Sequence, residues 1–137
     1  MLSDVWGTPG GTVWATGSCQ SGASFIPYGY VAQNDGAGWG DTPGFGFGLA
    51  LGSYRPLQTI WSSSANDVWV ASANETVSGT ATAPTMLHWN GTGWIASSQV
   101  ITAGINDLGG TSQNDVWAVG RAGKRLHYDG TTWTSTP

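Results

Sequence analysis

The chain is 137 residues long, carries a formal net charge of −4, and has only 9% charged residues, where about 25% is usual. Its four Lys and Arg residues can barely supply the clustered basic surface that phosphate binding needs, which argues against a nucleic-acid partner. No apolar run approaches the length of a membrane span, no signal peptide is visible, and the single cysteine, Cys19, cannot form an intrachain disulfide.

Two short phrases recur along the chain. The first is an apolar strand followed, after a turn, by a Val-Trp pair, and it occurs at residues 2–14, 57–69 and 105–117. The second is an apolar-His-aromatic strand, an Asn-Gly or Asp-Gly pair and a Trp, and it occurs at residues 87–94 and 126–133, with a fainter form at 32–39. Trp69 follows Trp14 by 55 residues, and Trp94 follows Trp39 by the same distance. A strict period of this size is typical of propeller blades or solenoid units.

Each repeat divides into four predicted strands, and the second copy shows them best, at residues 57–61, 68–71, 86–89 and 94–97. The pairs Asp35-Gly36, Asn90-Gly91 and Asp129-Gly130 between third and fourth strands predict two-residue type I′ hairpins. Gly or Pro interrupts every stretch long enough for a helix, so we expect almost none.

This pattern resembles the Trp-rich "NDVWAVG" repeats of bacterial, often secreted, β-propeller proteins. The resemblance covers nearly all of the chain, although Thr12 stands where the turn has Asp and residues 32–34 replace Leu-His-aromatic in the first copy. It implies four-stranded antiparallel blades with the first strand innermost: blade 1 at residues 1–56, blade 2 at 57–104 and blade 3 at 105–137. It also favours a secreted or cell-surface location.

Three blades are too few for a closed propeller, which usually has about 4 to 8. We therefore expect either a homodimer that closes a six-bladed ring or a chain that forms part of a larger propeller. The Gly-rich segment 44–52 alternates glycine with Phe or Leu, so it is either an extra strand or an interface segment, and Phe45 and Phe47 are candidate interface residues.

The connections between strands vary in length on one side of the blades only. Because strands alternate in direction, the second-to-third and fourth-to-first connections leave on the same side. The second-strand Trp and the fourth-strand Trp are 25, 25 and 16 residues apart in the three copies, whereas the other turns keep their length. We call this side the insertion face. Loops of variable length on a rigid framework commonly carry recognition, so it is the candidate binding face.

The candidate ligand-binding residues on the insertion face are Phe25, Tyr28, Tyr30, Tyr54, Arg55, Asn74, Glu75, Arg121 and Arg125. Phe25, Tyr28 and Tyr30 are expected in the first insertion loop. Flat aromatic rings beside amides and carboxylates suit a sugar, whose CH groups pack on rings and whose hydroxyls need donors and acceptors. The alternative is that these aromatics only cover the ends of the blades.

The repeated polar and aromatic residues are interpreted as structural. The tryptophans expected to pack blade against blade are Trp14, Trp39, Trp69, Trp94, Trp117 and Trp133, and their indole N–H groups need partners. Asp67 and Asp115 are expected to accept local backbone N–H bonds in their turns. His88 and His127 share a repeat position and are interpreted as packed, hydrogen-bonded residues, because two imidazoles without further ligands make a weak metal site.

Two functions of different class follow. One is a non-enzymatic recognition module, possibly lectin-like, that binds glycans through the insertion face. The other is a structural or self-assembly unit for protein–protein interaction, with no small ligand. No catalytic motif, metal site or cofactor is predicted, so we do not expect an enzyme.

Overall fold

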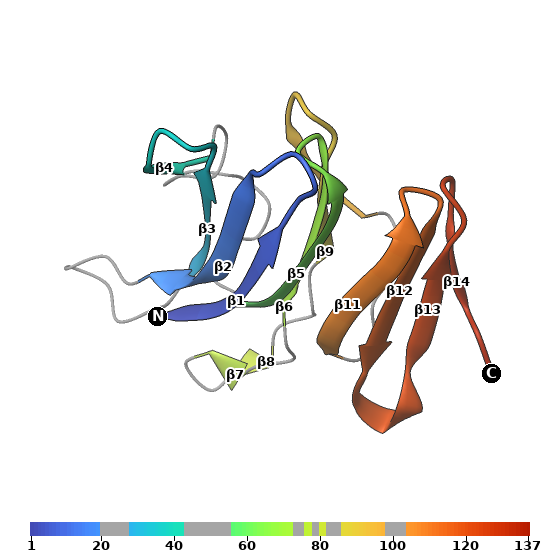
Figure 1. Ribbon diagram of the computed structural model, residues 1–137. Coiled ribbons are helices and arrows are strands. Elements are labelled where there is room, and N and C mark those ends of the chain that lie inside the picture. Colours follow the sequence, from blue (N-terminus) through green and yellow to red (C-terminus); the bar gives the residue numbers. More distant parts are fainter. Residues whose placement is uncertain (20–27, 43–55, 73–75, 78–79, 82–85, 98–103) are drawn as a thin grey trace.

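Each repeat forms a four-stranded antiparallel sheet in the computed structural model (Figure 1). The structure describes residues 1–19, 28–42, 56–72, 76–77, 80–81, 86–97 and 104–137. In blade 1 the strands are β1 (Leu2–Gly7), β2 (Val13–Cys19), β3 (Tyr28–Asn34) and β4 (Trp39–Asp41). In blade 2 they are β5 (Leu57–Ser64), β6 (Asp67–Ser72), β9 (Met86–Trp89) and β10 (Trp94–Ala96), and in blade 3 β11 (Ile105–Ser112), β12 (Asp115–Gly120), β13 (Arg125–Tyr128) and β14 (Trp133–Ser135).

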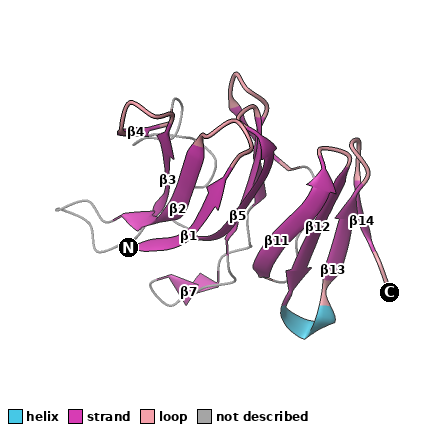
Figure 2. Cartoon of the chain, in the orientation of Figure 1, coloured by secondary structure: helices cyan, strands magenta, loops and turns pink. Residues whose placement is uncertain are grey.

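Strands follow one another in chain order across each sheet, and the predicted all-β fold of three antiparallel blades is confirmed. A small separate hairpin joins β7 (Thr76–Val77) to β8 (Thr80–Ala81) between β6 and β9. Within the described ranges the only helix is one 3-10 turn, Arg121–Gly123, at the end of blade 3 (Figure 2). None of the described helical segments is long and apolar enough to cross a membrane.

The core of the molecule lies between the blades. One apolar layer joins Trp14 and Val31 of blade 1 to the facing side of blade 2, and the other joins Trp61 and Trp69 of blade 2 to blade 3. Alternating side chains of a strand point to opposite faces of its sheet, so blade 2 contributes to both layers. Its strand β6 is buried along its whole length, as a central blade requires.

Each first strand carries a β-bulge, and the three bulges hold the first strands together. The register of the sheet shifts at the same repeat position in β1, β5 and β11. A bulge disrupts the ladder locally and frees polar groups for other partners. Ile60 N donates to Oδ2 of Asp4 at 3.0 Å, and Leu108 N donates to Oγ1 of Thr59 at 3.2 Å. These bonds link neighbouring blades, and β5 contacts both β1 and β11.

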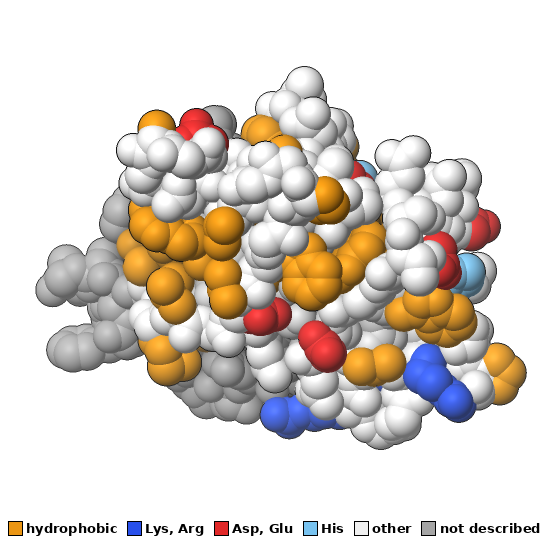
Figure 3. Space-filling model, in the orientation of Figure 1, with side chains coloured by type: hydrophobic (Ala, Val, Ile, Leu, Met, Phe, Trp, Pro, Cys, Tyr) orange, Lys and Arg blue, Asp and Glu red, His pale blue; other side chains and the backbone are white. Residues whose placement is uncertain are grey.

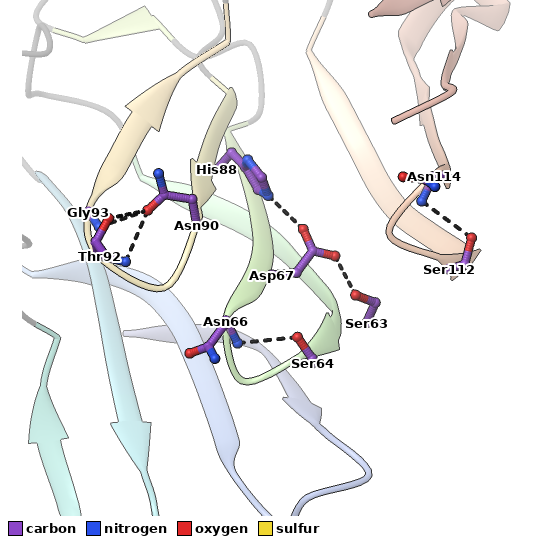
Figure 4. Close-up of polar contacts among 10 residues, drawn as sticks. All are labelled: Ser63, Ser64, Asn66, Asp67, His88, Asn90, Thr92, Gly93, Ser112 and Asn114. Carbon is purple, nitrogen blue, oxygen red and sulfur yellow. Dashed lines mark hydrogen bonds and ion pairs between the residues drawn. The ribbon is translucent and has the colours of Figure 1, made fainter. Parts of the chain in front are cut away.

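The third-to-fourth strand turns differ from the predicted type I′ hairpins. Gly36, Gly91 and Gly130 have positive φ, but the preceding Asp35, Asn90 and Asp129 do not, and each turn spans four residues. The prediction was wrong because the side chain before the glycine makes its own turn. Oδ1 of Asn90 accepts the backbone N–H groups of Thr92 and Gly93, both at 3.0 Å, as drawn in Figure 4.

Candidate functional site

The long connections of the described topology all leave the blades at one end. Strands β2, β4, β6 and β10 end there, and the connections that follow run over 20–27, 42–56, 73–85 and 97–104. At the opposite end the turns are short, from the two residues 65–66 to the five residues 8–12. The insertion face therefore combines connections of variable length with strand ends that the sheets hold in place, and binding residues are commonly found on such a surface.

Tyr28 and Tyr30 lie at the insertion face, but they do so in a strand. They begin β3 and pair with Cys19 and Gly17 of β2, which corrects the expectation that they lie in a loop. Aromatic residues alternating along four residues, Tyr28 to Val31, favour a strand, and residues two apart share one face of a sheet. The two half-buried phenols are therefore neighbours on the side of blade 1 that faces away from blade 2, because Val31 points the other way into the layer between these blades.

Tyr30 makes a direct polar contact at the insertion-face end of blade 1. Its hydroxyl donates to Oδ1 of Asp41, the last residue of β4, at 2.8 Å. The bond to this carboxylate is the main reason why the pKa of Tyr30 rises from 10.0 to about 12, with burial as the second cause. The pair presents an aromatic ring, a hydroxyl and an exposed carboxylate side by side, a combination that binds hydroxyl-rich or amide-rich ligands.

The basic residues of blade 3 lie at the same end, in and beside the 3-10 turn. Arg121 and Arg125 are exposed and Lys124 is half-buried. The turn is held by backbone bonds from Gly120 N to Lys124 O at 2.9 Å and from Arg121 N to Gly104 O at 3.1 Å. Three positive charges on a fixed turn form a local basic patch on a chain whose net charge is −4.

The remaining candidate residues lie outside the described residues. They are Phe25, Phe45, Phe47, Tyr54, Arg55, Asn74 and Glu75.

Blades 2 and 3 each contain a chain of hydrogen-bonded side chains made of a hydroxyl, an aspartate and a histidine. In blade 2 the Ser63 hydroxyl donates to Oδ2 of Asp67, and Nε2 of His88 lies 2.6 Å from Oδ1 of the same carboxylate (Figure 4). His88 stacks on Trp69 with ring centroids 4.1 Å apart. Among the described contacts the aspartate is bonded to side chains, where the sequence predicted backbone N–H donors.

Blade 3 repeats this arrangement of side chains with Thr111, Asp115 and His127. Nε2 of His127 lies 2.8 Å from Oδ1 of Asp115, and Nε1 of Trp117 donates to the same atom at 2.9 Å. These bonds, the one from Thr111 foremost, lower the pKa of Asp115 below 3.8. Each histidine is thus committed to an aspartate of its own blade, and within the described ranges no three His, Cys, Asp or Glu side chains gather as metal ligands.

The tryptophans of the two repeat positions meet each other across the blade boundaries. The rings of Trp14 and Trp94 are T-shaped with centroids 6.3 Å apart, and those of Trp69 and Trp133 are T-shaped at 5.2 Å. Partners for the indole N–H groups were expected, yet those of Trp14, Trp69 and Trp133 are buried without a partner among the described residues. These tryptophan pairs are therefore held by packing of the rings and not by hydrogen bonds of their N–H groups.

The same repeat positions are exposed at the two ends of the arc. Trp117 of blade 3 is 40% exposed, whereas Trp14 and Trp69 are 0% and 3% exposed. Trp39 of blade 1 is 56% exposed, whereas Trp94 and Trp133 are 9% and 7% exposed. Figure 3 shows hydrophobic side chains gathered over β1 to β3 and again over β11 and β12 on one side of the molecule. We call the surface with Leu2, Val5 and Trp39 the blade 1 end face, and the surface with Trp117 and Val119 the blade 3 end face.

Comparison with known proteins identifies the architecture. No family model matches the chain, and no curated protein matches it. Among solved structures, "YCF48 bound to D1 peptide", a β-propeller protein, superposes with a TM-score of 0.61 at 13% sequence identity. The match covers 98% of this chain and 38% of that chain. The fold is that of a β-propeller arc.

A groove between blades 2 and 3 has no counterpart among the features predicted from the sequence. It is lined by Trp69, His88, Ile95, Ala96, Ser97, Tyr128, Thr131, Thr132 and Trp133. Its aromatic wall is packed tightly, because Tyr128 lies 4.9 Å from Trp69 and 5.3 Å from Trp133 between ring centroids. These residues come together only because blades 2 and 3 pack side by side. The spacing of residues along the sequence therefore does not predict the groove.

Proposed function

We propose that this chain is a non-enzymatic β-propeller recognition module that binds its partner at the insertion face. The observation that carries this proposal is the asymmetry of the blades, with short turns at one end and every long connection at the other. Rigid sheets hold the strand ends in place while the connections vary, which is the usual construction of a binding surface.

The chemistry at this face favours a protein segment as the partner. The patch of Arg121, Lys124 and Arg125 attracts carboxylates, and arginine binds them with paired hydrogen bonds. The propeller structure that resembles this chain is described in complex with a peptide, which supports a peptide-like ligand. A glycan is the second candidate ligand, and the specific observation that favours it is the Tyr30–Asp41 pair, at the rim where the insertion face meets the outward side of blade 1.

Binding measurements against acidic peptides, neutral peptides and a glycan array test this function. We expect Arg121→Ala with Arg125→Ala to weaken an acidic peptide by about tenfold or more, and added salt to weaken it further. Tyr30→Ala should instead abolish glycan binding if sugars are the ligand. Thr131→Ala, on an exposed short turn at the opposite end, is the control. Saturable binding that Thr131→Ala removes and the insertion-face variants leave intact would place recognition elsewhere.

Assembly is a second candidate function, favoured by the two end faces. An exposed apolar surface formed by residues that are buried elsewhere in the same fold commonly marks a protein interaction site. Here the exposed residues occupy repeat positions that neighbouring blades cover at both internal boundaries. Measuring the molar mass of the chain by light scattering over a range of concentrations tests whether these faces associate.

A further inference from the structure

We propose that the blade 3 end face binds the blade 1 end face of a second copy of this chain, so that two copies close a ring of six blades. This inference rests on the assembly function proposed above and names its partner and its register. The two end faces are the two halves of one kind of boundary, and that boundary already occurs twice within the chain.

The apolar parts of the two faces are complementary. At each internal boundary the second-strand Trp of one blade packs on the fourth-strand Trp of the next, as in the pairs Trp14–Trp94 and Trp69–Trp133. Blade 3 offers an uncovered second-strand Trp117, and blade 1 offers an uncovered fourth-strand Trp39. Val5 is 58% exposed, although the matching Ile60 and Leu108 are 1% and 5% exposed. The two faces are thus complementary to each other in the same way as the blades on either side of an internal boundary.

A polar contact at the bulges sets the register. At each internal boundary the third residue of the first strand accepts the backbone N–H of the fourth residue in the next blade, as Asp4 does from Ile60 and Thr59 does from Leu108. Asp107 is the third such residue. Its Oδ1 accepts from Leu108 N at 2.9 Å and from the Thr59 hydroxyl at 3.1 Å. Oδ2 has no partner among the described contacts.

Blade 1 holds the matching donor. Val5 N donates to Oδ1 of Asp4 at 2.8 Å, and Leu108 N makes the equivalent bond to Asp107. Leu108 N also reaches Thr59 of the preceding blade, a second acceptor that Val5 N lacks among the described residues. Oδ2 of Asp107 in one copy therefore accepts from Val5 N in the other, and the boundary between copies repeats the boundaries within each copy.

The number of copies follows from the number of blades. A head-to-tail contact closes into a ring when the rotation between units divides the circle, and otherwise grows into a filament. Propellers close with about 4 to 8 blades, and among multiples of three only six lies in that range. The superposition of nearly the whole chain on a propeller structure supports a blade-to-blade rotation of the propeller kind. The ring then holds two identical junctions.

The experiment compares the chain with Trp117→Glu and Trp39→Lys by sedimentation and light scattering. We expect the unaltered chain to have twice its 14.2 kDa mass. Each variant should dissociate about thirtyfold more readily or more, because a buried Trp at an interface centre is commonly a hot spot. An equimolar mixture of the two variants should recover a dimer, since one of its junctions keeps both tryptophans. Ile95→Lys removes a similarly exposed apolar side chain, 54% exposed, from blade 2 and should have no effect.

A second pair of variants tests the register. Asp107→Asn replaces the free carboxylate oxygen by an N–H donor that faces Val5 N, so it should weaken the dimer by about tenfold or more. Asp4→Asn makes the same change at the boundary between blades 1 and 2, and should lower the melting temperature of the chain at all concentrations. Circular dichroism checks that every variant folds.

The outcomes separate the two proposals. A chain that stays monomeric at its highest soluble concentration overturns both assembly and pairing. A dimer that survives Trp117→Glu and Asp107→Asn, or variants whose mixture does not recover a dimer, overturns the head-to-tail pairing and leaves assembly by another surface. If the unaltered chain forms a species larger than a dimer, while the mixture of the two variants stops at a dimer, the head-to-tail contact does not close a six-bladed ring.

Discussion

Tyr30 and Asp41 form a hydrogen-bonded pair whose effect on stability has a defined pH range. The bond raises the pKa of the phenol from 10.0 to about 12, so the folded state retains the proton more strongly than the unfolded state. Its contribution to stability is therefore fully present below pH 10 and is lost as the pH rises through about 12. Burial also raises the pKa of Tyr28 and Tyr128, so we expect Tyr30 to be the last of these three tyrosines to titrate when phenolate absorbance is followed.

Two variants assign that late titration. Tyr30→Phe should remove it, and Asp41→Ala should return it toward 10 because the acceptor is gone. Identical titration curves for Asp41→Ala and the unaltered chain would show that the bond does not set the pKa.

At the scale of single residues, the sequence predicted which positions repeat but not what they contact. The histidines at one repeat position were expected to be hydrogen-bonded, and His88 and His127 do bind Asp67 and Asp115. The part of Ser63 and Thr111 was not foreseen, because a hydroxyl four residues before an aspartate is common in polar turns. The bond from Ile60 N to the Asp4 carboxylate depends on a bulge, and no residue type marks that bulge in the sequence.

The four-residue turn is the element whose detailed prediction failed, and its glycine gives a stability test. Gly130 has φ +96°, and a Cβ added there would lie 2.4 Å from Oδ1 of Asn114. Gly130→Ala should therefore lower the free energy of unfolding by about 1–3 kcal/mol. Urea denaturation measures the change.

Gly93 supplies the matched control in the corresponding turn of blade 2. It has ordinary φ and nothing within 4 Å of an added Cβ, and blade 3 has Thr132 at the same position. Gly93→Ala should leave stability unchanged or raise it slightly. An equal loss in both variants would refute the assignment of strain to Gly130.

At this scale the strand content was largely predictable. The run Met-Leu-His-Trp, bounded by the turn-forming pair Asn90-Gly91, located the third strand of blade 2 at residues 86–89, as observed. The first strands are longer than predicted, since β5 continues to Ser64 through a second register shift. Polar residues such as Ser62 to Ser64 carry no strand signal, and sheet pairing alone extends the strand.

Across the whole molecule, one repeat position allows burial to be separated from residue type. Trp69 is 3% exposed between two blades, while Trp117 is 40% exposed on the blade 3 end face. Removal of a buried aromatic commonly costs about 3–5 kcal/mol, so Trp69→Ala should lower the free energy of unfolding by that amount. Trp117→Ala should cost much less in chains diluted to the monomer. Thermal melts at several dilutions check both values, and equal losses would mean that the end face is covered in the monomer.

The division into three sheets could be predicted because the same two phrases recur in each copy, and the resemblance to propeller repeats implied their radial arrangement. The groove beside Tyr128 and the pairing of Trp14 with Trp94 could not, because they depend on which face of one blade meets which face of the next. That choice is made by packing between sheets, and a pattern within one repeat does not contain it.

The two halves of the proposed junction lie at opposite ends of one polypeptide. Fusing two copies of the chain in tandem would therefore place both halves in the same molecule. The junction between copies would then be intramolecular, and its effective concentration would be set by the linker in place of the amount of protein. Such a fusion needs no new contact. The fused chain would contain all six blades of the proposed ring in one polypeptide of twice the length.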